Sequence, residues 1–420
     1  MSFWVEHLPL HALSTDGRLL FGTRLVRLFA YGLLSVVLVL YLSQVGLREA
    51  EIGLLLTLTL VGDTAISLWI TTNADRIGRR RMLLTGAILM IFAGVLFAAT
   101  GNFILLLVAA TIGVISPSGN EVGPFLSIEQ AALSQLLPAG QRTRIFAWYN
   151  LVGSFATAIG ALSGGMLAQA FISSGVSPLA SYRMVLIGYA ATGLVLVGLF
   201  AQLSPAAEVA LQPDSISDRE PGRRILGLHR SRRVVFKLAA LFSLDAFAGG
   251  FVIQSLVAYW FHIRFGVEPG LLGGIFFGAN LLAGFSALSA AWVASRIGLV
   301  NTMVFTHLPS NVLLICVPLM PTLPLAILIL LLRFSISQMD VPTRQSYTMA
   351  VVAPDERSSA SGLTGIARTI GASVAPLFTG LFLANPALLG LPFFLSGGLK
   401  IVYDLALYHS FRTLKPEEER

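Results

Sequence analysis

The stretch NADRIGRRRMLL, residues 73–84, joins two long apolar segments through a short loop that carries four arginines and one aspartate. A shift of 220 residues aligns its RIG triplet, residues 76–78, with the RIG triplet at 296–298 in ASRIGLVNT, residues 294–302. A second shift, of 215 residues, aligns Gln130 with Gln345 and Arg142 with Arg357. Loop charges that fall in register indicate an internal duplication. We therefore expect two copies of one helical unit.

The composition indicates that both copies lie in a membrane. Of the 420 residues, 55% are hydrophobic and only 12% are charged, and the mean hydropathy is +0.79. Soluble domains contain about 25% charged residues. Apolar runs long enough to cross a hydrocarbon layer of about 30 Å recur along the whole chain, which favours helices over a β-barrel.

Apolar runs and polar breaks predict an all-α polytopic membrane protein with twelve transmembrane helices in two pseudo-symmetric six-helix bundles. The expected domains are an N-terminal bundle (1–203), a polar, basic linker (204–233) and a C-terminal bundle (234–420). The spans are expected near 22–44, 51–72, 82–101, 104–136, 144–171, 182–203, 235–263, 269–293, 301–320, 323–350, 358–384 and 390–410.

The basic residues predict the orientation. With the N-terminus inside, twenty arginines and lysines fall on the cytoplasmic side, and only Arg48, Arg183 and Arg264 fall outside. Positively charged loops stay in the cytoplasm, so we expect both termini and the linker to be cytoplasmic. We also expect the protein to lie in the cell (inner) membrane. Two repeated six-helix bundles are typical of transporters whose substrate site lies between them.

The loop at 73–84 resembles a loop of the major facilitator superfamily, G-x-L-A-D-R-x-G-R-[KR]. Residues 74–76 and 78–80 match, whereas Thr71 and Asn73 replace the glycine and the leucine. The resemblance extends over the whole chain and implies that family's fold and transport by alternating access. It also implies a charge latch at the cytoplasmic gate, formed by Asp75, Arg76, Gly78 and Arg79. The alternative is that these charges only fix the topology.

Span five resembles the G-x8-G-x3-G-P-x2-G-G pattern of proton-coupled exporters of this superfamily. Three of the six positions match, namely Gly160, Gly164 and Gly165. Small residues at this spacing also let helices approach closely, which is the structural alternative.

Span ten carries Arg333, Asp340 and Arg344 at spacing i, i+7, i+11. On a continuous helix the three lie within about 40° of one another. They would cost about 8–10 kcal/mol if all faced lipid, so we expect them to face water or protein. Asp340 and Arg344 could simply neutralise each other, whereas Arg333 would remain as a binding group for carboxylate or phosphate.

The segment GVISPSGNEVGPFLSIEQAALSQ, residues 113–135, places prolines, glycines and two carboxylates in the fourth span. We expect an interrupted span whose freed carbonyls line a cavity or meet other protein. Its carboxylate Glu121 is either a proton carrier or the static partner of Arg27 or of an arginine in the second half. Glu129 lies nearer the cytoplasm, and Asn120 is a further candidate of this segment.

Other intramembrane polar residues complete the candidate substrate and proton pathway: Arg27, Asp63, Gln254 and Arg368. In the resembling family, spans nine and twelve lie outermost. His307 of span nine is therefore expected to face lipid, and Lys400 and Asp404 of span twelve are expected to pair with each other at i, i+4. Asp245 is expected near the interface.

The leading functional hypothesis is proton-coupled efflux of a small organic molecule by a secondary active transporter. The alternative is an importer or facilitator of an organic anion that intramembrane arginines clamp. The partners are then a small-molecule substrate, protons and the bilayer, with no nucleic acid, and we expect a monomer. The six histidines are scattered, and no metal, cofactor or nucleophile motif is present. The sequence therefore does not predict an enzyme.

Overall fold

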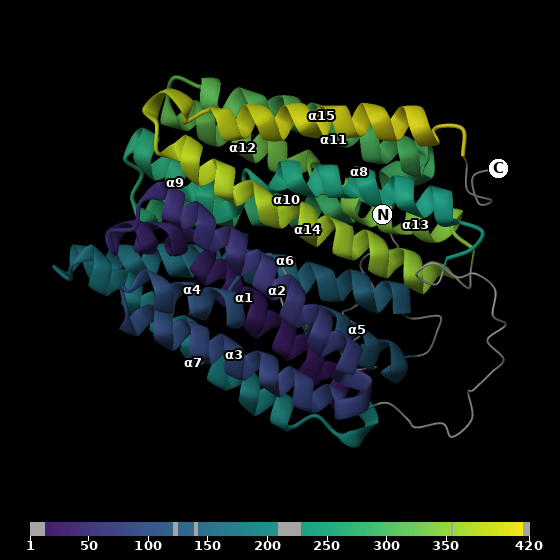
Figure 1. Ribbon diagram of the computed structural model, residues 1–420, viewed down its shortest axis with the longest axis horizontal. Coiled ribbons are helices and arrows are strands. Elements are labelled where there is room, and N and C mark those ends of the chain that lie inside the picture. Colours follow the sequence, from purple (N-terminus) through teal and green to yellow (C-terminus); the bar gives the residue numbers. More distant parts are fainter. Residues whose placement is uncertain (1–12, 121–124, 138–141, 209–227, 354–355, 415–420) are drawn as a thin grey trace.

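The computed structural model describes residues 13–120, 125–137, 142–208, 228–353 and 356–414. Figure 1 shows long helices that run side by side along one axis of the molecule. The helices of the first half are α1 (Thr15–Gln44), α2 (Glu49–Ile77), α3 (Arg79–Ala99), α4 (Phe103–Ile112), α5 (Phe125–Leu136), α6 (Arg142–Ser173) and α7 (Pro178–Ala201).

The helices of the second half are α8 (Arg232–Gly250), α9 (Gln254–Phe265), α10 (Pro269–Ile297), α11 (Leu299–Cys316), α12 (Leu323–Ile336), α13 (Asp340–Val351), α14 (Arg357–Leu383) and α15 (Leu391–Phe411). In Figure 1 the first half, purple to teal, lies below the second half, green to yellow. We call the end of the molecule at which α7 ends and α8 begins the linker end, and the other end the opposite end.

Within the described residues, eleven segments are long and apolar enough to cross a membrane, and two of them combine a pair of α-helices, α8 with α9 and α12 with α13. The one span not among these eleven is the fourth along the chain. It consists of α4 and α5, which have 10 and 12 residues. Each is shorter than the roughly 20 residues that a spanning helix needs. The predicted twelve-span fold with an interrupted fourth span is thus confirmed.

The interruption of span four follows from its sequence. Pro117 has no backbone N–H, and Gly119 has a φ of +70°, a conformation that favours glycine. The Tyr189 hydroxyl donates to the carbonyl of Val114 at 2.6 Å, so that this freed acceptor is satisfied inside the bundle.

The duplicated loops have the same backbone form. Gly78 ends α2 with a φ of +110°, and Gly298 ends α10 with a φ of +85°. Both glycines turn the chain directly into the next helix, because their positive φ angles are accessible to glycine at little steric cost. The repeated RIG triplet therefore marks two equivalent tight turns at the linker end.

The two halves meet along α6 with α10 and along α2 with α14. At the opposite end, a Cβ on Gly165 would lie 2.3 Å from the Pro269 carbonyl oxygen and 2.8 Å from Cα of Gly273. A Cβ on Gly53 would lie 2.6 Å from the carbonyl oxygen of Pro376. Backbones from the two halves thus touch here, as small residues permit.

Candidate functional site: two buried charge clusters and the junction between the halves

The first cluster is an ion pair between α1 and α5. Arg27 holds the carboxylate of Glu129 with two parallel hydrogen bonds, Nη1 to Oε1 and Nη2 to Oε2, each 2.7 Å long. Both side chains are 0% exposed. The Thr23 hydroxyl donates to Oε1 at 2.8 Å, and the Tyr149 hydroxyl donates to Oε2. Such a bidentate, fully buried pair is rigid, because further hydrogen bonds hold both carboxylate oxygens.

A second arginine of α1 lies one turn nearer the linker end. Arg24 donates from Nε to the carbonyl oxygen of Tyr149 at 2.7 Å and from Nη2 to Oδ1 of Asn150 at 3.1 Å. Its guanidinium lies 4.3 Å from the centre of the Tyr149 ring. These contacts fasten α1 to α6 on the linker side of the ion pair.

The second cluster lies in the C-terminal half and is branched. Arg344 of α13 contacts two carboxylates, Asp245 Oδ2 and Asp340 Oδ2, each 3.1 Å from Nη1. Lys400 of α15 donates to the other oxygen of Asp245 at 2.5 Å. Arg368 of α14 approaches Asp245 less closely, with 3.8 Å between Nη1 and Oδ2. Asp245 is thus shared by three cations from three helices.

The two clusters occupy corresponding places in the duplicated halves. The 215-residue shift that relates the halves places Glu129 on Arg344. Arg27 and Asp245 are separated by 245 − 27 = 218 residues, which lies between the two shifts. Each half therefore joins its first and fourth spans by a buried ion pair, but the positions of acid and base are exchanged.

Asp245 is 4% exposed, and its expected place near the interface stays a prediction. Two sequence-based expectations for the second half are wrong. Lys400 and Asp404 do not pair with each other, since Lys400 bonds Asp245 and Asp404 bonds His307, with 2.8 Å between Oδ1 and Nδ1. His307 does not face lipid, because it is 4% exposed and points towards α15. Tertiary partners on other helices outweigh the i, i+4 neighbour here.

The charged stripe of span ten also differs from the expectation of a continuous helix. Span ten breaks between α12 and α13, so Arg333 and Asp340 belong to different helices. Pro342 explains the break, because its ring clashes with the carbonyl four residues earlier. The N–H of Gln338 in the break donates to the Ser286 hydroxyl at 3.2 Å. The pairing of Asp340 with its neighbour at i+4 is confirmed.

Two arginines of this half have incompletely satisfied guanidinium groups. In the described part of the chain, Nε of Arg333 and Nη1 of Arg368 are buried without a hydrogen-bond partner. The Arg333 guanidinium lies 4.9 Å from the centre of the Phe334 ring. The Arg368 side chain is 35% exposed. Both groups retain donors that an anionic group could use.

The junction between the halves carries uncharged polar groups. Gln254, the first residue of α9, donates to the Ser35 hydroxyl at 2.6 Å and accepts from the Asn280 amide at 3.1 Å. The N–H of Ser255 donates to the carbonyl of Pro117 at 3.1 Å, so the broken fourth span contacts the second half. The polar break of span four thus meets protein, as the sequence predicts.

Asn120 lies in the same break. Its backbone carbonyl accepts a hydrogen bond from the Ser116 hydroxyl at 2.7 Å, and the residue is exposed. The neighbouring Gly119 carbonyl accepts a weaker bond from Thr157 of α6 at 3.4 Å.

Towards the opposite end, further bonds cross the junction. The Tyr259 hydroxyl of α9 donates to Glu49 Oε1 at 3.1 Å and lies 3.3 Å from the Ser43 hydroxyl. Together with the glycine contacts described above, these bonds hold the two halves against each other at this end.

The expected latch is only partly described. Arg79 is 9% exposed and donates to Gln135 Oε1 at 2.9 Å, within its own half. Gly78 lies beside the carboxylate of Glu208, which accepts from the N–H groups of Arg79 and Arg80 at the start of α3. These contacts show Arg79 as a brace of the first half. Its part in a latch between the halves stays a prediction.

Other candidate residues are less informative. Asp63 of α2 is 8% exposed and accepts a long bond of 3.4 Å from Ser67. Glu121 lies outside the described residues, as do the side chains of Asp75 and Arg76. Their roles as proton carrier and latch stay predictions.

Glu356 caps the start of the second half. It is 1% exposed, and its carboxylate accepts the N–H groups of Arg230 and Ser231 at 2.7 and 2.8 Å, as well as that of His229. Burial alone would raise the pKa of Glu356, but the hydrogen bonds from Ser231 and these backbone groups outweigh it and hold the pKa at about 2. This carboxylate stays ionised at neutral pH at the N-terminal end of α8.

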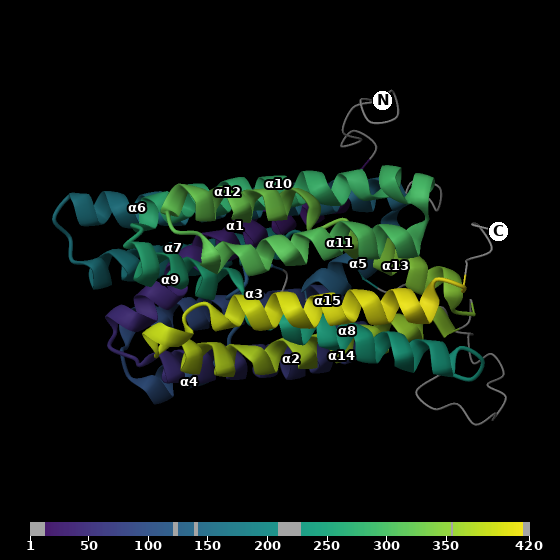
Figure 2. The same cartoon turned by 90° about the horizontal axis from the view of Figure 1, so that it is seen from above.

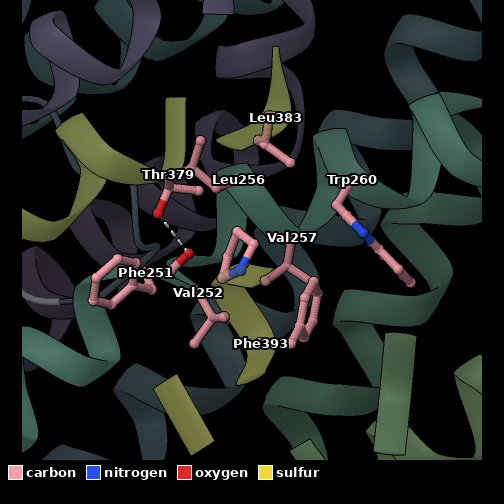
Figure 3. Close-up of a pocket in the computed structure, with 9 residues that line it drawn as sticks. Phe251, Val252, Leu256, Val257, Trp260, Thr379, Leu383 and Phe393 are labelled. Carbon is pink, nitrogen blue, oxygen red and sulfur yellow. Dashed lines mark hydrogen bonds between the residues drawn. The ribbon is translucent and has the colours of Figure 1, made fainter. Parts of the chain in front are cut away.

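Figure 3 shows a small, mostly apolar pocket beside the break between α8 and α9. Phe251, Trp260 and Phe393 are among its lining residues, and the Thr379 hydroxyl donates to the Phe251 carbonyl at 3.1 Å. The enclosed space is far smaller than the roughly 300–1,000 Å³ of typical ligand sites. We therefore assign it to helix packing and not to the substrate.

Two duplicated six-helix halves with interrupted spans and buried charges define a secondary membrane transporter. The chain belongs to the Major Facilitator Superfamily, whose family model matches residues 20–376. This is a family of transporters, not of enzymes.

The chain is similar in sequence to two further proteins and similar in fold to a solved structure. It is 33% identical to the uncharacterized membrane protein YJR124C of Saccharomyces cerevisiae over 94% of this chain and 93% of the relative. It is 26% identical to the quinolone resistance protein NorA of Staphylococcus aureus over 33% of this chain and 34% of NorA. A bacterial homologue of the human lysosomal transporter Spinster, in an inward-facing and occupied conformation, superimposes with a TM-score of 0.70 at 16% identity, over 97% of this chain and 98% of that one. This last similarity shows the fold alone.

Proposed function

We propose that this transporter works by alternating access and that the described conformation is closed at the opposite end. The observation that carries the proposal is the set of contacts between the halves at that end. Gly53 and Gly165 bring backbones together, and Tyr259 bonds residues of the first half. With the linker end in the cytoplasm, as the basic loops predict, this conformation is inward-facing. The cell membrane remains the expected location.

The transport we propose is proton-coupled efflux of a small organic molecule. The partial similarity to NorA supports it, because that protein is named for resistance to quinolones. The buried carboxylates also support it, since intramembrane acids that exchange partners can carry protons. Asp340 and Glu121 are the proposed carriers, and the polar junction around Gln254 is the proposed contact surface for the molecule.

A second candidate is transport of an organic anion. Asp245 and Asp340 carry two negative charges, whereas Arg344, Arg368 and Lys400 carry three positive charges, so this cluster has an excess of 3 − 2 = 1 positive charge. A carboxylate or phosphate would neutralise it, and Arg368 has a donor to offer.

The experiment begins with a screen of small organic molecules for thermal stabilisation of the purified protein, because binding to the folded form raises its stability. Compounds that stabilise it are then tested for flux in proteoliposomes with and without a pH gradient. Proton-coupled efflux predicts gradient-dependent flux that Asp340→Asn abolishes. Glu51→Gln, at a partly exposed pair with Arg48, is the matched acid-to-amide control.

Two results would decide between the candidates. Equal flux with and without the gradient would exclude proton coupling and leave the facilitator of organic anions. Stabilisation by anionic compounds alone, lost in Arg368→Gln, would select the anion.

A further inference from the structure

The helices α11 and α15, which lie side by side in Figures 1 and 2, share a buried histidine–carboxylate pair. His307 Nδ1 lies 2.8 Å from Asp404 Oδ1, and the Asn311 amide donates to Asp404 Oδ2 at 2.8 Å. Asp404 and Asn311 are 0% exposed, and His307 is 4% exposed. The Asn311 amide nitrogen also lies 3.2 Å from His307 Nδ1. An ionised carboxylate can only accept a hydrogen bond, so Nδ1 carries the proton towards Asp404 and Nε2 is the ring nitrogen open to a further proton.

This pair is connected to the central charge cluster. Lys400 lies one turn before Asp404 on α15 and bonds Asp245, which in turn contacts Arg344 and Arg368. Residues four apart on a helix lie on the same face. Lys400 is therefore within reach of two carboxylates, one in the central cluster and one in the histidine pair.

A network of this kind is not required for stability. Buried ion pairs can often be replaced by apolar residues of similar volume without loss of stability. Near the pair, Ser310 Oγ and Asn311 Oδ1 are also buried without a hydrogen-bond partner in the described part of the chain. Unsatisfied buried polar atoms cost about 1–3 kcal/mol each, so this region is unfavourable as mere packing.

We propose that His307 is a further proton-binding group beside the carriers Asp340 and Glu121, and that Lys400 transmits its charge to the central cluster. The inference rests on the proposed proton-coupled transport and adds a site to it. The titratable groups that interact with the pair from the neighbouring helices are Asp245 of α8 and Lys400 and Tyr403 of α15. Behind Asp245 lie Arg344 and Arg368, and Asp340 contacts Arg344.

The charges give the direction of the effect. With a neutral imidazole, the negative charge of Asp404 offsets the single excess positive charge of the central cluster. One proton taken up at Nε2 makes an imidazolium whose charge Asp404 neutralises. Lys400 is then held by Asp245 alone, as in this structure. When the proton leaves, Asp404 regains its attraction for Lys400 and competes with Asp245, which loosens the contact between α15 and α8.

A labelling experiment tests this without a known substrate. Ser43, at the closed end against Tyr259, is replaced by cysteine in a Cys316→Ser background, since Cys316 is the only native cysteine. The rate of labelling by a water-soluble maleimide is measured from pH 5.5 to 8.5 and corrected for reagent reactivity with a free thiol. If one proton shifts the equilibrium between the two conformations, the rate changes about fivefold or more over this range.

The test variants are His307→Gln and Lys400→Met. The matched control is His409→Gln, which changes an exposed histidine on α15, the helix of Lys400. We expect His307→Gln and Lys400→Met to lose the pH dependence and His409→Gln to keep it. A purely structural role predicts lower melting temperatures with an unchanged pH profile. An unchanged profile in folded His307→Gln would overturn the inference while leaving proton coupling through another group intact.

Two further outcomes are decisive. A wild-type rate that does not vary with pH would overturn both this inference and proton coupling. If His307→Gln does not fold, nuclear magnetic resonance of ¹⁵N-histidine in the wild-type protein replaces the variant. One buried histidine that gains a proton between pH 5.5 and 8.5 supports the inference, and buried histidines that keep one form overturn it.

Discussion

The two halves of this transporter contain the same buried ion pair in two different settings. In the first half, Arg27 donates two short hydrogen bonds to the carboxylate of Glu129. The hydroxyls of Thr23 and Tyr149 donate to the same two carboxylate oxygens. In the second half, Asp245 is divided among several cations. The closed pair has one set of partners, whereas the shared acid has three candidate partners. We therefore propose that the first half is a fixed brace and that the second half can change its pairing.

The largest effect is expected from breaking the closed pair. Glu129→Gln leaves the Arg27 guanidinium buried without its counter-ion and should lower the free energy of unfolding by about 3–5 kcal/mol. Thermal unfolding of the purified protein measures this. The double variant Arg27→Met with Glu129→Gln should lose less than the sum of the single variants. Additive losses would contradict a direct pair.

A smaller effect is expected from the branched cluster. Asp340→Asn removes one of the two carboxylates at Arg344, but Asp245 remains at 3.1 Å. We expect a loss of about 2 kcal/mol, typical of one hydrogen bond to a charged group, together with the loss of gradient-driven flux. If Asp340→Asn destabilised the protein as much as Glu129→Gln, the contrast between brace and adjustable cluster would fail.

Each half also has a helix whose first N–H groups are capped by a carboxylate, Glu208 at α3 and Glu356 at α8. These two caps allow a third comparison of the halves. Glu356→Gln should destabilise the protein by about 1–2 kcal/mol at pH 7, as loss of a helix cap does. Because the pKa of Glu356 is lowered from 4.5 to about 2, its contribution is complete above pH 4.5 and is lost as the pH falls towards 2. Unfolding measured between pH 7 and 3 should show the difference from the wild type shrinking.

The matched variant for this comparison is Glu208→Gln, which removes the half-buried cap of α3. It should cost less than Glu356→Gln, because its carboxylate is more accessible to water. A constant Glu356→Gln deficit at all pH values would contradict the lowered pKa.

The smallest effect is expected at the junction. Gln254→Ala removes the bond to Ser35 and the acceptor for Asn280. It should weaken the closed form by about 1 kcal/mol, the typical net value of a hydrogen bond, and so increase labelling of a cysteine at position 43 about fivefold. Ser204→Ala, in a bond to Asp16 outside the junction, is the control. An unchanged labelling rate in Gln254→Ala would show that this bond does not hold the closed form.

The sequence predicts the fold because the fold depends on local patterns. Apolar length defines the spans, the repeated RIG triplet marks the two tight turns, and Pro117 with Gly119 marks the interruption. The breaks in spans seven and ten are harder to predict. Gly249 and Gly250 precede one and Pro342 follows the other, but such residues also occur within continuous membrane helices.

The candidate site is predicted less well, because pairing depends on how helices rotate against one another. Arg27 and Glu129 are both recognised as intramembrane charges, yet nothing local shows that they meet. Lys400 and Asp404 have ideal i, i+4 spacing and still bond residues of other helices. Asp245 is recognised as a charge of span seven, but its sequence position does not reveal which helices lie beside it.

The central claim is that the two halves rock about the junction, closing one end as the other opens. Spin labels on cysteines in a Cys316→Ser background test it most directly, with one pair at Gln44 and Arg264 near the opposite end and another at Arg81 and Ser295 near the linker end. All four positions are exposed. On a change of pH, or on addition of a stabilising compound, we expect the first distance to increase and the second to decrease together. Distances that stay fixed under both conditions, or that change in the same direction, would contradict the account.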